Sequence, residues 1–148
     1  GGYFPLWGTC LGFEWLVQAV GGKPALQHGF DAENITLPLA FTHAAERSRL
    51  YGDEELRHVL TKYPVTMNNH EDGIEPKHLA ANSRLASTFD VLSTNWDKQG
   101  RPFVSSMEAK KAPVYGVQYH PEKNTFEWGT NKDGTPYEVI QHSPQAVS

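Results

Sequence analysis

A glycine-flanked cysteine near the start of the chain constrains its fold most strongly. Cys10 is the only cysteine among the 148 residues, and Gly8 and Gly12 lie two positions to either side of it. Residues 4–9 predict a buried strand, and residues 11–20 predict a helix. A Gly-x-Cys-x-Gly sequence between a strand and a helix is typical of a nucleophile elbow, where glycines leave room that a Cβ would fill. The helix N-terminus is expected to favour the thiolate form of Cys10.

A second motif near the other end of the chain favours a catalytic cysteine over the simpler alternative, a small buried apolar side chain. Residues 114–119 predict a strand that delivers His120 at its carboxyl end, where Pro121 stops it. Catalytic groups of open α/β sheets gather at such strand ends. Glu122 can accept a hydrogen bond from the imidazole and orient it, as the third member of a triad does. For this motif alone, a surface histidine beside a solvated carboxylate remains an alternative.

Together the two motifs resemble the Cys-His-Glu signature of the class I glutamine amidotransferase superfamily. Residues 3–14, 114–124 and 126–128 closely resemble the γ-glutamyl hydrolase family within it, and the resemblance extends over essentially the whole chain. It implies an α/β fold with an open, mostly parallel, flavodoxin-like sheet flanked by helices. It also implies that residues 1–148 are the C-terminal portion of a larger single domain, without its N-terminal strands and its C-terminal helix.

The resemblance also implies catalytic roles. Cys10 would attack the carbonyl carbon of a γ-glutamyl amide in a folylpoly-γ-glutamate and form a thioester, with His120 and Glu122 completing the triad. The backbone N–H of Leu11 would stabilise the oxyanion, together with a donor from the part that precedes this chain in the family. The reaction is that of a cysteine-type omega peptidase, and it uses no metal or organic cofactor.

Two further residues are candidates for substrate binding. His70 follows a polar, turn-like stretch, and the resemblance places it beside the nucleophile, where it would position the γ-glutamyl group. Glu14 lies four residues after Cys10 and so faces the same side of the predicted helix. A carboxylate that simply favours a helix N-terminal turn explains Glu14 equally well. The other histidines show no metal-ligand spacing: His28, His43, His58, His78 and His142.

The composition of the chain limits the classes of binding partner that we expect. A net charge of −4 and a pI near 6.0 give no argument for nucleic-acid binding. No apolar run approaches the roughly 20 residues of a membrane span. Asn34-Ile-Thr36 is an N-glycosylation sequon, and with the family's usual routing to the lysosome, the vacuole or the exterior it favours a secreted or lysosomal glycoprotein. A small-molecule substrate and a homodimer are expected by resemblance.

Two other functions stay open. A glutaminase domain that supplies ammonia to a synthase uses the same Cys-His-Glu apparatus, but the Phe126-Glu-Trp128 context and the sequon argue against it. A non-catalytic binding or storage protein on the same fold is the other, and the intact triad argues against that.

Hydrophobic patterning and turn residues predict the elements between the two motifs. They are a strand at 35–41 weakened by Pro38, a helix at 54–60 capped by Asp53, an extended piece at 65–68, a helix at 76–81, and a hairpin of strands 85–94 and 102–107. Residues 125–137 predict a loop that Trp128 packs down.

Overall fold

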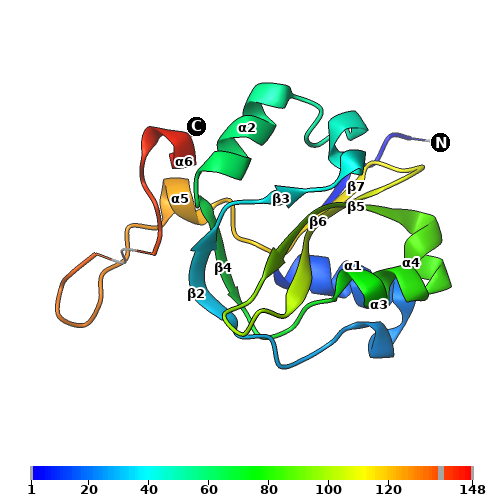
Figure 1. Cartoon of the computed structure of the whole chain (residues 1–148), viewed down its shortest axis with the longest axis horizontal. Coiled ribbons are helices and arrows are strands. Elements are labelled where there is room, and N and C mark those ends of the chain that lie inside the picture. The colour runs from blue at the N-terminus through cyan, green and yellow to red at the C-terminus, as the bar shows by residue number, and fades with distance from the viewer. Residues whose placement is uncertain (1, 137–138, 148) are drawn as a thin grey trace.

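The computed structural model describes residues 2–136 and 139–147 (Figure 1). Its centre is a five-stranded sheet in the order β1-β7-β6-β5-β3, beside a two-stranded antiparallel sheet of β2 and β4. The strands are β1 (Leu6–Thr9), β2 (Ala32–Leu37), β3 (Ala40–Phe41), β4 (Thr66–His70), β5 (Phe89–Trp96), β6 (Pro102–Ala109) and β7 (Val114–Val117).

Helices flank the central sheet on both sides, with α1, α3 and α4 below it and α2 above it in Figure 1. Their bounds are α1 (Leu11–Gly21), η1 (Lys23–Ala25), η2 (His43–Arg47), α2 (Glu54–Lys62), α3 (Pro76–Ala81), α4 (Ser83–Thr88), α5 (Lys123–Phe126) and α6 (Pro144–Val147), where η marks a 3-10 helix. Among residues 2–136 and 139–147, none of these helices has the length and apolar character that crossing a bilayer requires.

The central sheet is mixed. β1 pairs parallel with β7, whereas β7–β6, β6–β5 and β5–β3 are antiparallel. The predicted open α/β sheet with flanking helices is confirmed, but the expectation of mostly parallel pairing is corrected to one pair among the four described. The cause is connection length, because β5, β6 and β7 follow one another through short turns, which permit only antiparallel neighbours.

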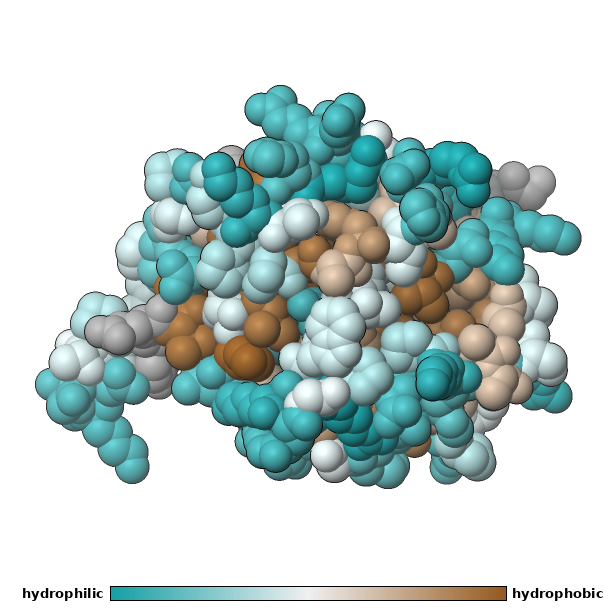
Figure 2. Space-filling view, in the orientation of Figure 1, coloured by the Kyte–Doolittle hydropathy of each residue, from teal (hydrophilic) through white to brown (hydrophobic). Residues whose placement is uncertain are grey.

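Two apolar clusters, one on each face, hold the helices to the sheet. The cluster under α1 contains Phe13, Leu16 and Val17, whose spacing of three and four residues places them on one side of that helix. Gly116 of β7 lets α1 approach closely, since an added Cβ would lie 3.0 Å from Phe13 Cδ2. The second cluster is built from Leu39, Ala45, Tyr51, Leu92, Val117 and Tyr119. Apolar residues also reach the surface, and Figure 2 shows them as separate patches among hydrophilic ones.

Several predicted boundaries shift for local reasons. Pro38 interrupts the predicted strand at 35–41, so that β2 ends before it and β3 starts after it. The predicted cap of α2 is confirmed, with the Asp53 carboxylate accepting from Leu56 N at 2.8 Å. The hairpin prediction is wrong at residues 85–88, which are helical because the Asn82 side chain accepts from Leu85 N and caps α4. The predicted loop at 125–137 begins within α5, and residue 137 lies outside the described residues.

Candidate active site

The backbone at Cys10 is strained. The residue lies between β1 and α1 with φ 49° and ψ −102°, and non-glycine residues rarely adopt a positive φ. Its N–H donates to the Val117 carbonyl at 2.9 Å, and its own carbonyl accepts from Glu14 N at 3.0 Å. Both β7 and the first turn of α1 therefore hold the sharp turn, which has the geometry of the predicted elbow.

Only one of the two flanking glycines is needed for space. A Cβ on Gly8 would lie 2.7 Å from the carbonyl carbon and oxygen of Gly12 and 2.9 Å from Phe13 N, all backbone atoms. Around a Cβ on Gly12 the structure has open space. The expectation that both glycines prevent a clash is therefore corrected to Gly8, because only the strand residue faces the helix backbone.

The expectation of a resting thiolate is wrong. Burial, followed by the negative charge of Glu14, raises the pKa of the Cys10 thiol to about 11. The backbone N–H of Leu11 and the side-chain amide of Gln118 act in the opposite direction but do not outweigh these two causes. Desolvation of the charged form therefore exceeds the helix N-terminal effect, and the free protein holds Cys10 as a thiol.

His120 lies just beyond β7, which ends at Val117 rather than at Tyr119 as predicted. The His120 backbone N–H donates to the Met67 carbonyl at 2.8 Å, so β4 helps to fix this segment. The His120 Nδ1 lies 2.7 Å from Glu122 Oε1. Because a carboxylate only accepts, Nδ1 carries the proton, and Nε2 is left for proton transfer. This is the orientation expected from the sequence.

Parallel pairing brings the two motifs together. Thr9 is in register with Val117, so Cys10 and His120 both leave the sheet at the carboxyl edge of neighbouring strands. Adjacent strands lie about 4.8 Å apart. The charge of Glu122 acts on the Cys10 thiol, and the charge of His120 acts on Glu14. The structure thus groups four residues that the sequence analysis selected.

Glu14 and Gln118 meet beneath this edge. Glu14 is buried, and burial raises the pKa of its carboxyl group. Its Oε1 accepts a hydrogen bond from Gln118 Nε2 at 3.0 Å, and the same nitrogen lies 3.9 Å from Cys10 Sγ. Gln118 was not among the site residues predicted from the sequence. The available signal was a polar residue that alternates in phase with Gly116 and His120 on the inward side of a predicted strand.

His70 lies at the end of β4 and is buried rather than in an open loop. Its Nδ1 donates to the Asp72 carbonyl at 2.8 Å, and Nε2 lies 3.2 Å from Asn68 Oδ1. The Phe103 ring and the imidazole pack edge to face, with 4.8 Å between ring centroids. Burial lowers the pKa of His70 to about 4, and the charge of His120 acts in the same direction. His70 is therefore neutral and near the candidate site.

A surface pair that the sequence did not predict lies beside these groups. His28 Nδ1 is 2.7 Å from Asp72 Oδ1, and the charges of both residues act on Glu14. No sequence pattern links residues 44 positions apart. Among residues 2–136 and 139–147 no three His, Cys, Asp or Glu side chains are grouped so that they could hold a metal ion. Asn34 of the sequon is exposed at a bulge of β2, with φ 51°.

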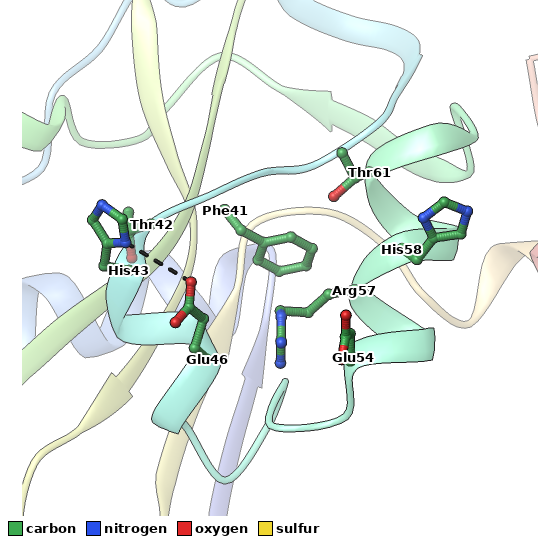
Figure 3. A pocket seen from close by; sticks show the side chains of 8 residues that line it. All are labelled: Phe41, Thr42, His43, Glu46, Glu54, Arg57, His58 and Thr61. Carbon is green, nitrogen blue, oxygen red and sulfur yellow. Dashed lines mark ion pairs between the residues drawn. The ribbon is translucent and has the colours of Figure 1, made fainter.

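A polar pocket of about 550 Å³ lies elsewhere, between β3, η2 and α2 (Figure 3). In it His43 points toward Glu46, with Nδ1 and Oε1 3.8 Å apart. Its lining is Phe41, Thr42, His43, Glu46, Glu54, Arg57, His58 and Thr61. None of the predicted site residues is among them. A second pocket of about 590 Å³ has Tyr119 and Pro121, the chain neighbours of His120, in its wall, but none of the predicted site residues lines it.

Comparison with known proteins agrees with this geometry. A family model described as glutamine amidotransferase class-I matches residues 2–132. The chain is 41% identical over 139 residues to gamma-glutamyl hydrolase B of Dictyostelium discoideum, covering 93% of this chain and 40% of the relative. It is 42% identical over 149 residues to the gamma-glutamyl hydrolase of Homo sapiens, covering 99% of this chain and 44% of the relative. It is 34% identical over 151 residues to gamma-glutamyl hydrolase 1 of Arabidopsis thaliana, and this match covers 100% of this chain and 43% of the relative.

The chain thus spans about two fifths of the length of the curated relatives that it matches. A solved structure from Thermoplasma acidophilum, described as that of a GMP synthase subunit, matches with a TM-score of 0.50 and 18% identity. The match covers 82% of this chain and 49% of that one. At this identity the match supports the fold and carries no argument about activity.

Proposed function

Because this chain belongs to the class-I glutamine amidotransferase family, we propose that it carries the catalytic residues of a γ-glutamyl hydrolase. One observation carries the proposal. A strained cysteine at the head of α1 and a carboxylate-oriented histidine leave the sheet at the same edge of two parallel strands. This pairing of a thiol with a base that a third group orients is the arrangement of cysteine-dependent acyl transfer.

The reaction begins from a neutral thiol. His120 Nε2 takes the proton of Cys10 as the sulfur attacks the γ-carbonyl carbon, so the thiolate forms only with the substrate in place. The tetrahedral oxyanion accepts a hydrogen bond from the Leu11 N–H, which already points its donor toward the sulfur. His120 then gives its proton to the leaving amine, and the thioester remains. Water, deprotonated by His120, attacks the thioester, and the glutamate carboxylate leaves as the thiol is restored.

The substrate that we propose is a folylpoly-γ-glutamate, with the γ-glutamyl unit bound between Glu14 and His70. Both side chains are buried, and His120 acts electrostatically on each of them. A neutral His70 offers the substrate an uncharged imidazole, and the Glu14 carboxylate offers a hydrogen-bond acceptor for an amide or ammonium group. Support from comparison comes from the shared name of the animal, plant and Dictyostelium relatives.

We further propose a secretory route to the lysosome, the vacuole or the exterior, with a glycan on Asn34 and a homodimeric assembly. The exposure of Asn34 at a bulge supports a glycan at this position, because acceptor sites for glycosylation lie on the protein surface. Expression in a secreting eukaryotic cell tests it. Glycosidase treatment is expected to shift the mass of the wild-type chain and to leave Asn34→Gln unchanged.

The activity is tested by supplying pteroylpentaglutamate and free glutamine in parallel, with Cys10→Ala as the control. Because the human relative is covered over only 44% of its length, the chain is assayed alone and with the N-terminal part of that relative placed before it. Release of glutamate or shortened folate that Cys10→Ala abolishes is the expected result. Ammonia from glutamine with the folate intact would indicate a glutaminase, and no turnover in a folded protein would indicate a binding protein.

A further inference from the structure

A thiol and a carboxyl group, each of which can become negatively charged, lie on one side of α1. Cys10 and Glu14 lie one helical turn apart, and both approach the same amide nitrogen of Gln118. The charge of Glu14 opposes ionisation of the thiol. A nucleophile that must become negative during the reaction therefore has a buried carboxylate as its neighbour, and some group must reduce the repulsion.

Gln118 is placed to do so. Its side chain is fully buried, and its Nε2 lies 3.0 Å from Glu14 Oε1 and 3.9 Å from Cys10 Sγ. A primary amide carries two N–H donors on one nitrogen, enough for one bond to each acceptor. The Gln118 backbone N–H donates to the Ser105 carbonyl at 2.8 Å, which anchors the residue to β6. One short segment therefore holds both this amide and His120.

The other end of the same amide is unsatisfied. Gln118 Oε1 is a buried side-chain oxygen that has no hydrogen-bond partner among the described residues. Gly73 closes over it, and a Cβ on Gly73 would lie 3.5 Å from this oxygen. Leaving a buried acceptor unpaired costs free energy, which a side chain with a purely structural role tends to avoid. Because a carboxylate and a thiolate only accept hydrogen bonds, the NH2 group must face them, and the oxygen is left unpaired.

We propose that Gln118 is a positioning residue of the reaction, which donates one N–H to Glu14 and the other to the Cys10 sulfur as it becomes a thiolate. The proposal rests on the proposed function only in taking Cys10 as the nucleophile. The other charged groups that act on Cys10 or Glu14 are Glu122 and His120 beyond β7, Asp72 beyond β4 and His28 before β2. All four are retained in the variants below, so differences between variants report on Gln118 and Glu14.

The first test measures how fast iodoacetamide alkylates the protein as pH rises from about 7 to about 9. Because Cys10 is the only cysteine, the rate reports on this thiol alone. Gln118→Met keeps the length of the side chain and removes both donors. Its rate is expected to fall about tenfold at every pH, equivalent to one unit of thiol pKa. Gln99→Met, which replaces an exposed amide in the turn between β5 and β6, is the matched control and should react like wild type.

A double-mutant cycle separates positioning from simple packing. Glu14→Gln is expected to speed alkylation about threefold alone and about tenfold in the Gln118→Met background, since the carboxylate is then no longer held by the amide. Strictly additive effects on the logarithm of the rate would overturn the proposal. So would a Gln118→Met profile that superimposes on that of the wild type in a protein with an unchanged circular dichroism spectrum.

A measurement on the unmodified protein covers the case in which Gln118→Met does not fold. The two side-chain N–H resonances of Gln118 are followed by NMR while Cys10 is titrated, and the thiolate is monitored by its ultraviolet absorbance. One resonance is expected to shift with the same midpoint as thiolate formation. In the control variant Cys10→Ala, this shift should be absent. Resonances that do not move would overturn the proposal. None of these experiments uses a γ-glutamyl substrate, so failure of the proposed activity would leave their outcome readable.

Discussion

At the scale of single residues, Cys10 departs from ordinary behaviour in two ways. Its backbone occupies a conformation that a non-glycine residue rarely adopts, and burial raises the pKa of its thiol to about 11. Both features follow from the position of Cys10, which is the single residue between the end of β1 and the start of α1. Under the proposed function the thiolate therefore forms only during the reaction, so activity should depend strongly on the base His120 and on Glu122, which orients it.

Glu122 is the residue on which this sensitivity can be measured. Glu122→Gln keeps an oxygen that can accept from His120 Nδ1 but removes the negative charge that stabilises the imidazolium. We expect kcat on a γ-glutamyl substrate to fall about tenfold or more, with KM nearly unchanged. Steady-state kinetics with Glu127→Gln as the control would show it, since Glu127 pairs with Lys123 nearby. Equal kcat values for the two variants would contradict the orienting role.

At the scale of elements, the β1–α1 junction depends on a close approach of two backbones. Gly8→Ala places a Cβ 2.7 Å from Gly12 backbone atoms, so the helix must move away from the strand. We expect a loss of about 2 kcal/mol or more in the free energy of unfolding. Gly12→Ala meets open space within a helix and is expected to gain about 0.5–1 kcal/mol. Urea denaturation of both variants measures the difference, and a Gly8→Ala protein as stable as wild type would contradict the packing argument.

Some elements of this fold could be predicted from the sequence and others could not. The elbow, α3 and the Asp53 cap were predictable because each depends on residues within a few positions. The helix at 83–88 was not, since Asn82 offered a cap that competes with the strand propensity of the residues after it. The pairing of β1 with β7 joins distant parts of the chain and has no local signal beyond the two motifs. The thiol pKa depends on burial by the whole fold, so the position of Cys10 at a helix N-terminus did not predict it.

At the scale of the whole molecule, the candidate site is assembled from both ends of the sequence and from β4 between them. Stability and site geometry are therefore linked, and His70 provides a way to observe the link. It is buried and neutral, with a pKa of about 4 against an ordinary value of 6.5. In the pH range between these values the unfolded chain binds the extra proton, so the fold is stable above it and loses stability as pH falls through it.

This penalty for protonating His70 can be measured directly. A shift from 6.5 to about 4 corresponds to about 3 kcal/mol, lost between about pH 6.5 and pH 4. The raised pKa of Glu14 acts in the opposite direction, because the folded state there binds the proton more tightly and gains stability as pH falls. His70→Asn is therefore expected to flatten the decline in unfolding free energy, measured by urea denaturation at several pH values. His58→Asn, which changes an exposed histidine of α2 outside the candidate site, is the control. A wild-type slope in His70→Asn would mean that the pKa of His70 is the same in the folded and the unfolded chain, and burial would then not be what keeps its imidazole uncharged.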